Sequence, residues 1–120
     1  KEKVALIWIK DNTPKDSTIL SLYKEGYLIN SIAERKSFID QNFLLVHDIN
    51  QKFEDHEVMY NSKFSTNAIR LLTKYEIDYI YFSSKTKSTF NIEEIAYVYD
   101  ECFPLVYDGE LKIYKVVCII

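Results

Sequence analysis

The sequence predicts an α/β fold, a three-layer Rossmann-like sandwich whose mainly parallel sheet ends in an antiparallel hairpin. Segments with helical spacing of apolar residues alternate along the chain with short runs rich in β-branched and aromatic residues. The last two extended segments are joined by Asp108-Gly109, a dipeptide typical of hairpin turns. We therefore expect helices on both faces of one sheet, with right-handed crossovers between its parallel strands.

The first third of the chain predicts two helices and two short strands. Apolar residues recur with helical spacing up to Asn12, and Thr13 and Pro14 end this helix because proline has no amide hydrogen to donate. Gly26 stands where a strand must turn into the next helix. In order, the predicted elements are a helix over residues 2–12, a strand over 18–23, a helix over 26–34 and a strand over 37–40.

The rest of the chain predicts three helices, a central strand and the hairpin. Residues 77–82 are nearly continuous in β-branched and aromatic side chains, as expected of a strand covered on both faces. Residues 41–46 fit either a strand or a loop over the core. The other predicted elements are a helix capped by Asp48, a helix capped by Ser65 or Thr66, a polar loop over 83–89, a helix capped by Asn91 that holds Tyr99, and hairpin strands over 102–107 and 110–119.

Length and composition predict one soluble domain, residues 1–120, with a core large enough to be stable without disulfide bonds or a bound metal. Apolar residues make up 48% of the chain and charged residues 28%, which excludes a disordered chain. The net charge is −3 with acids and bases interspersed, so nucleic acid is not an expected partner. No apolar run is long enough to span a bilayer, and the chain starts without methionine, as a fragment of a longer protein would.

Cys102 and Cys118 are predicted to be free thiols. With a two-residue turn at 108–109, Tyr107 faces Glu110 and Cys102 faces Lys115. That register leaves Cys118 three residues beyond its partner position, from 115 to 118, and on the opposite face of the sheet. Three residues of strand span about 10 Å, which exceeds what a disulfide tolerates. The sequence therefore leaves the redox compartment undetermined.

The first position to examine for a ligand is the corner at Gly26, because open α/β sheets bind ligands where strands turn into helices. The structural alternative is a corner that simply needs the permissive backbone angles of glycine. Arg35 and Asp40 bracket the second strand, where they either pair with each other or bind a polar ligand. The candidate ligand-binding or acceptor-binding residues, at this corner and at neighbouring strand ends, are Tyr23, Glu25, Gly26, Arg35, Asp40, Ser83 and Ser84.

No motif in the sequence indicates a catalyst or a metal site. Ser83 and Ser84 follow the central strand, but no Gly-x-Ser-x-Gly elbow surrounds them. His47 and His56 fit one helix face only loosely and lack a cysteine or further histidine nearby, so we expect His56 at the margin of the core. The chain has two glycines, too few for a phosphate-binding loop. We therefore expect no catalytic residue, no metal ligand and no cofactor in this chain.

The order and spacing of several short stretches resemble a known family. The stretches are residues 5–14, residues 26–29 with Arg35, residues 71–80, and residues 102–103 followed by 106–109 and 113–114. They resemble the extracytoplasmic soluble domain that follows the membrane helices in archaeal multi-pass, lipid-linked-sugar glycosyltransferases, including relatives of the oligosaccharyltransferase catalytic subunit. The resemblance covers most of the chain.

The resemblance also implies which acceptor contact has changed. In oligosaccharyltransferases the loop after the first strand carries Trp-Trp-Asp-Tyr-Gly, which helps to recognise the hydroxyl residue of the acceptor. Here residues 22–26 read Leu-Tyr-Lys-Glu-Gly. Lys24 cannot accept the hydrogen bond that an aspartate offers to a hydroxyl group. The resemblance therefore implies a more distant relative, such as a transferase with another acceptor.

Three functional hypotheses follow. The leading one is an extracytoplasmic domain, inactive alone, that positions an acceptor or partner above the membrane-embedded active site of a polytopic glycosyltransferase-like protein. Its implied partners are its own transmembrane domain and a protein or glycan acceptor. The parent protein would use a divalent metal and a polyprenyl-linked sugar donor, held outside this chain. The alternatives are a free-standing Rossmann-like small-ligand-binding or regulatory module and an inert structural domain.

Overall fold

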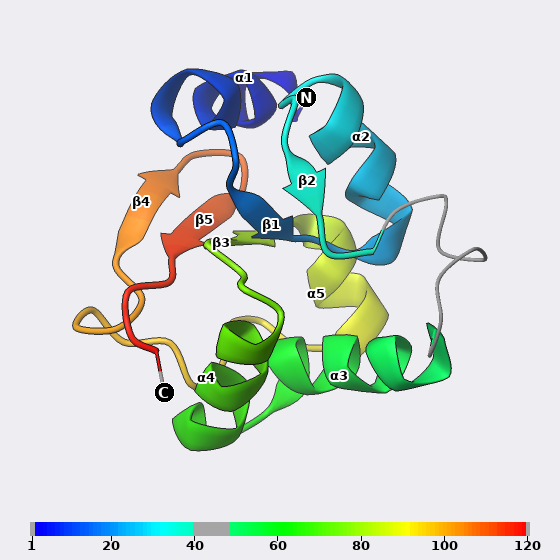
Figure 1. Ribbon diagram of the computed structural model, residues 1–120, viewed down its shortest axis with the longest axis vertical. Helices are drawn as coiled ribbons and strands as arrows, with labels where there is room; N and C mark the ends of the chain where they lie inside the picture. Colours follow the sequence, from blue (N-terminus) through cyan, green and yellow to red (C-terminus); the bar gives the residue numbers. More distant parts are fainter. Residues whose placement is uncertain (1, 40–48, 120) are drawn as a thin grey trace.

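The computed structural model describes residues 2–39 and 49–119. Helices and short strands alternate along most of the chain (Figure 1). The elements are α1 (Lys3–Asn12), β1 (Thr18–Leu20), the 3-10 turn η1 (Tyr23–Glu25), α2 (Gly26–Ser31), β2 (Lys36–Ser37), α3 (Ile49–Asn61), α4 (Ser65–Lys74), β3 (Tyr79–Phe82), α5 (Ser84–Phe90), β4 (Leu105–Asp108) and β5 (Lys112–Lys115).

The five strands form one mixed sheet in the order β2-β1-β3-β5-β4. β1 pairs in parallel with both β2 and β3, whereas β5 pairs antiparallel with β3 and with β4. The sheet is thus parallel at one end and antiparallel at the other. The predicted α/β class and the terminal hairpin are confirmed, but the sheet is mixed and not mainly parallel. The predicted strands 18–23, 102–107 and 110–119 are shorter than expected, and the strand predicted over 37–40 is observed as β2, Lys36–Ser37.

Both faces of the sheet carry apolar side chains, which alternate along each strand. On β3, Tyr79 and Tyr81 belong to the core cluster that includes residues of α1 and α2, while Ile80 and Phe82 belong to the cluster that includes residues of α3 and α4. All four are buried. The prediction of a strand covered on both faces within residues 77–82 is confirmed, although the strand itself begins at Tyr79. In Figure 1, α1 and α2 accordingly lie on one side of the sheet and α3 and α4 on the other.

Two local predictions in the segment after β3 are wrong. The predicted polar loop 83–89 is the helix α5, which begins where the Ser83 side chain accepts a hydrogen bond from the Thr86 amide. Asn91 ends this helix in the left-handed conformation, at φ 54°, instead of beginning another. Residues 92–104 contain no helix. Their buried side chains include Ile95 and Tyr97, two residues apart, a spacing that a helix would place on different faces.

The predicted boundaries of the remaining helices agree with the structure in some cases and differ in others. The helix over 2–12 is confirmed as α1 within a residue or two, and the helix predicted to follow Ser65 or Thr66 is confirmed as α4. The residue that precedes α4 in the cap position is Phe64, not Ser65 or Thr66. α3 starts at Ile49. Asp48, His47 and residues 41–46 lie outside the described residues.

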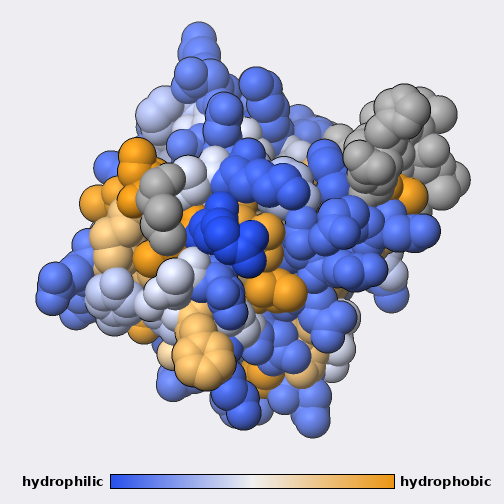
Figure 2. Space-filling model, turned by 60° about the horizontal axis from the view of Figure 1, so that its bottom comes forward, coloured by the Kyte–Doolittle hydropathy of each residue, from blue (hydrophilic) through white to orange (hydrophobic). Residues whose placement is uncertain are grey.

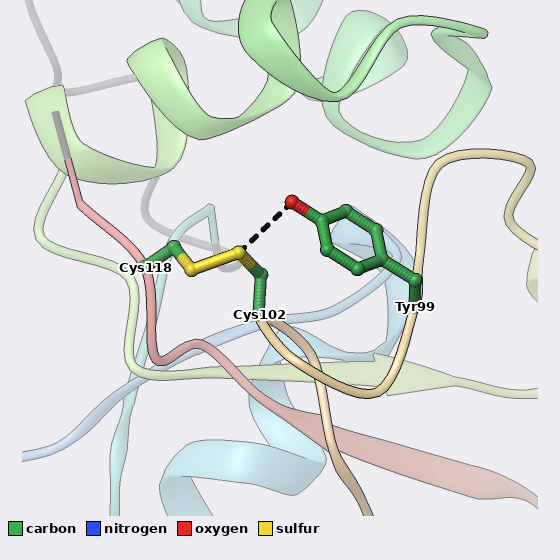
Figure 3. The surroundings of a disulfide bond; sticks show 3 residues. All are labelled: Tyr99, Cys102 and Cys118. Atoms are coloured by element: carbon green, nitrogen blue, oxygen red, sulfur yellow. Dashed lines mark hydrogen bonds between the residues drawn. A yellow bond between two sulfur atoms is a disulfide. The ribbon is translucent and has the colours of Figure 1, made fainter.

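Cys102 and Cys118 form a disulfide, so the prediction of free thiols is wrong. The strand β4 continues through Asp108, which pairs with Lys112, and Tyr107 pairs with Ile113 instead of Glu110. The loop is therefore residues 109–111, and the partner of Tyr107 moves by three residues, from 110 to 113. Beyond an irregularity between Leu105 and Tyr107, Leu105 pairs with Tyr114, two residues further along than the predicted register would place its partner, 112. This shift closes the gap that had separated the cysteines, and their Cα atoms lie 4.9 Å apart. The Tyr99 hydroxyl donates a hydrogen bond to the Cys102 Sγ at 3.0 Å (Figure 3).

The longer hairpin loop has a physical reason in Glu110. One oxygen of its carboxylate accepts a hydrogen bond from the Tyr107 hydroxyl at 2.7 Å, and the other accepts from the Ala5 amide in the first turn of α1 at 3.3 Å. The amides of the first turn of a helix have no partner within the helix, and the positive end of its dipole favours an anion there. Gly109 makes room for the Tyr107 ring, since a Cβ at that position would lie 2.8 Å from its hydroxyl oxygen.

We expect loss of the disulfide to lower the free energy of unfolding by about 3 kcal/mol, the value typical of a loop of this length. The measurement is urea unfolding of the oxidised chain, of the chain with reductant, and of the variant with Cys102→Ala and Cys118→Ala. The Tyr99→Phe variant is the control, because it removes one hydrogen bond and keeps the disulfide. An unfolding midpoint that does not respond to reductant would contradict the disulfide.

Glu76, which follows α4 and has φ 55°, adopts the left-handed conformation that favours glycine. We expect Glu76→Gly to raise the free energy of unfolding by about 1 kcal/mol, because a residue with a Cβ is strained there. The control is Glu57→Gly on the exposed face of α3, which should lower stability by about the same amount. Thermal unfolding of both variants tests the opposite signs, and a loss of stability in both would show that Glu76 is not strained.

Candidate functional site

The carboxyl ends of β1 and β3 lie side by side and define the edge at which an α/β sheet usually binds its ligand. From β1 the chain turns through η1 into α2, and from β3 it enters α5. We call the residues that follow these two strands, 21–26 and 83–86, the carboxyl edge. Two predicted site residues, Glu25 and Ser83, meet at this edge.

Glu25 is 1% exposed, and its carboxylate contacts the Ser83 hydroxyl. The distances from the Ser83 Oγ to the two carboxylate oxygens are 2.8 and 3.0 Å. The same Oγ lies 3.3 Å from the Thr86 hydroxyl and accepts the Thr86 amide that begins α5. A buried polar cluster thus joins the end of β1 to the end of β3.

A second acidic side chain, Glu2, reaches this cluster from the residue before α1. It accepts a hydrogen bond from the Tyr81 hydroxyl at 2.7 Å. Burial raises the pKa of Glu25 from 4.5 to about 7, while the hydrogen bond from Ser83 lowers that pKa and the neighbouring Glu2 carboxylate raises it. Near neutral pH Glu25 therefore holds a proton for much of the time.

Helix α3 covers the cluster with two side chains that bind strand carbonyls. The Tyr60 hydroxyl donates to the Leu20 carbonyl at 3.1 Å and lies 2.6 Å from the Tyr81 carbonyl. His56 Nε2 lies 2.8 Å from the Ser21 carbonyl, and burial lowers the pKa of this histidine. The neutral ring therefore donates from Nε2. His56 is 2% exposed, so it lies within the core instead of at its margin.

Gly26 and Tyr23 lie at the corner between β1 and α2, and the backbone angles there do not require a glycine. Gly26 is buried and has φ −56° and ψ −37°, the angles of an ordinary helical residue. The explanation that the corner requires the permissive angles of glycine is therefore wrong. The Tyr23 ring packs edge-on against Phe53 at 5.2 Å and near His56.

Arg35 lies away from the carboxyl edge and binds the end of α1. Its Nε donates to the Thr13 hydroxyl at 2.9 Å. Its two terminal nitrogens donate to the carbonyls of Thr13, Lys10, Glu34 and Ala33 at 2.7, 2.8, 2.9 and 3.4 Å. All five donors of the guanidinium are thus used within the chain. The structure gives Arg35 a stabilising role, and Asp40 lies outside the described residues.

The accessible part of the carboxyl edge is a hollow of about 380 Å³. Ser84, Lys24 and Lys85 are exposed on its rim. The remaining lining residues are Leu22, Ser88 and Thr89. Two ammonium groups and three hydroxyl groups can hold a polar ligand here. Among the described residues no group of three His, Cys, Asp or Glu side chains is placed to hold a metal.

Sequence reasoning missed Glu2, Tyr60 and Thr86 as parts of this cluster. The sequence predicts Glu2 only as a helix residue and gives Tyr60 no place at a site. A partial signal exists for Thr86, because Ser83 followed three residues later by a threonine fits a helix start. No signal in the sequence shows that Glu2 would approach Glu25, since 23 positions separate them.

A solved structure with a similar fold is the C-terminal globular domain of an oligosaccharyltransferase from Archaeoglobus fulgidus. The TM-score is 0.68, the sequence identity is 18%, and the match covers 95% of this chain and 95% of that one. At this identity the match shows the fold. No protein-family profile and no curated protein matches the chain. Among the described residues no helix is both long enough and apolar enough to cross a membrane.

We expect Glu25 to make stability depend on pH. Below pH 4.5 both folded and unfolded chains carry the proton, and the contribution of Glu25 to stability is complete. As pH rises from 4.5 through about 7, the unfolded chain loses the proton first, so the free energy of unfolding falls. The fall is on the order of 3 kcal/mol, since each pKa unit corresponds to about 1.4 kcal/mol.

The variant Glu25→Gln tests this expectation, because it keeps the shape of the side chain and removes its titration. Urea unfolding of this variant should show a flatter dependence on pH between 4.5 and 7 than the natural chain. Glu57→Gln, on the exposed face of α3, should keep the natural slope. Equal slopes in Glu25→Gln and the natural chain would show that Glu25 does not hold the proton.

Proposed function

We propose that this chain is a soluble, Rossmann-like extracytoplasmic domain of a glycosyltransferase-like membrane protein. In this proposal the domain positions an acceptor or partner and is not catalytic by itself. The observation that carries the proposal is the fold likeness to the oligosaccharyltransferase domain, which covers 95% of both chains. The partners would be a protein or glycan acceptor and the transmembrane domain of the same protein.

The disulfide supports the extracytoplasmic location. Cys102 and Cys118 are bonded, and structural disulfides persist in oxidising compartments and are rare in the cytosol. A hairpin closed in this way suits a domain that works outside the cell membrane.

The carboxyl edge supports the positioning role. Its buried Glu25–Ser83 pair joins the end of β1 to the end of β3, and its rim presents Lys24, Ser84 and Lys85 to solvent. In the proposal these exposed groups contact the acceptor or partner by hydrogen bonds and charge. In the proposal the divalent metal and the polyprenyl-linked sugar donor are held by other parts of the protein.

The same rim favours a second candidate function, a free-standing small-ligand-binding or regulatory module. A hollow of about 380 Å³ lies within the usual size range of small-molecule sites. The two candidates differ in what the rim contacts. In the first it contacts a membrane-bound partner or an acceptor, and in the second a diffusible small molecule.

Photo-crosslinking in the native membrane tests the proposal. A photoreactive phenylalanine analogue replaces Ser84 on the rim, and in the matched control it replaces Glu57 on the exposed face of α3. We expect the Ser84 position to crosslink to the membrane-embedded part of the same protein or to a glycosylated acceptor, and the Glu57 position to give neither product. Recovery of the chain from the cytosol, with no membrane-bound crosslink from either position, would reject this function and favour the free-standing module.

A further inference from the structure

A second and larger hollow lies at the opposite edge of the sheet, where the parallel strands begin. It measures about 570 Å³ and is framed by the loop between α1 and β1, the segment between α4 and β3, and the end of β5. We call it the amino-edge hollow. Its lining residues include Asn12, Asp16, Ser17, Lys36, Glu76, Asp78, Tyr79 and Lys115.

Two buried hydroxyl-bearing side chains open into this hollow. Ser17 is 3% exposed and Tyr79 is 6% exposed. Neither side chain makes a hydrogen bond with another described residue, unlike the Tyr60 and Tyr81 hydroxyls. Among the described residues, every fully enclosed side-chain nitrogen or oxygen has a partner. The hydroxyls of Ser17 and Tyr79 must therefore remain accessible, and the surface that both residues line is the amino-edge hollow.

Hydrogen-bond acceptors also line this hollow. One carboxylate oxygen of Asp78 accepts the Thr18 amide at 2.8 Å, which fixes the side chain and leaves its other oxygen for a ligand. Asp16 and Glu76 add two more carboxylates to the lining. The helices α1 and α4 both end next to this edge, and the carbonyl end of a helix dipole carries negative partial charge.

Hydrogen-bond donors complete the lining and limit the kind of ligand. The three carboxylates and two helix carbonyl ends disfavour phosphate and other anions, and the ammonium groups of Lys36 and Lys115 offset the attraction that this negative charge would have for a cation. The apolar lining is confined to the side chains of Pro14 and Val116 and parts of other residues, so an acyl chain would find little apolar surface. A lining that combines donors and acceptors matches a neutral molecule whose groups both donate and accept.

We propose that the amino-edge hollow binds a neutral carbohydrate. The Ser17 and Tyr79 hydroxyls and the two lysine ammonium groups donate to sugar oxygens, and the free oxygen of Asp78 accepts from a sugar hydroxyl. The hollow lies at the other end of the strands from the carboxyl edge. The proposal rests on this lining alone and holds whether or not the proposed function is correct.

Amide chemical shifts of the 120-residue chain, measured by NMR during titration, test the proposal. The probes are glucose, mannose and N-acetylglucosamine, with inorganic phosphate and free lysine as comparison ligands, each up to about 50 mM, well above a millimolar Kd. We expect at least one neutral sugar to shift the amides of Ser17, Thr18 and Tyr79 in a saturable manner. Phosphate and lysine should leave these amides unchanged.

Tyr79→Phe locates the binding, because it removes one hydroxyl and keeps the buried ring. We expect it to weaken sugar binding about fivefold or more, the effect of one lost hydrogen bond. The control, Tyr27→Phe on the exposed side of α2, should bind as the natural chain does. The proposal is overturned if no sugar shifts these amides, if only phosphate or lysine does, or if both tyrosine variants bind equally well.

Discussion

The complete burial of β3 is the constraint on which the rest of the structure depends. Its four side chains point alternately to the two faces of the sheet, and each face is apolar, so helices must cover both. Because β3 is also the strand between the parallel and the antiparallel halves, it places β1 on one side and the hairpin on the other. The polar groups at its two ends then become the walls of the two hollows.

The sequence alone was sufficient to predict a helix or strand where its hydrophobic pattern was long or continuous. The helical spacing in α1, α3 and α4 and the apolar run of β3 were interpreted correctly, because burial on a fixed face leaves a periodic trace in the sequence. The helix α5 leaves no such trace. Its residues 84–90 are mostly polar, and what holds the helix is the local Ser83 cap together with the burial of Thr86. The position of Ser83 depends in turn on a tertiary contact, its hydrogen bond to Glu25.

The length of the hairpin loop depends on a contact with a residue far away in the sequence. A two-residue turn and a three-residue loop are both compatible with Asp108-Gly109, and the choice depends on Glu110, whose carboxylate binds the start of α1 more than one hundred positions earlier in the chain, from 110 to 5. The candidate site likewise depends on contacts between residues far apart in the sequence, which the sequence alone does not reveal. Glu25 and Ser83 could be named from their positions after strands, whereas Glu2 and Tyr60 could not, because only the folded chain brings them to that edge.

The disulfide also determines how the domain would respond to mechanical force. It joins residues 102 and 118, so the whole β4–β5 hairpin lies inside one covalent loop. A pull applied beyond Cys118 passes through the sulfur atoms into Cys102 and the segment before it. The hydrogen bonds between β4 and β5 carry none of this load. A domain tethered at that end could be stretched without unzipping the hairpin that forms the antiparallel side of its sheet.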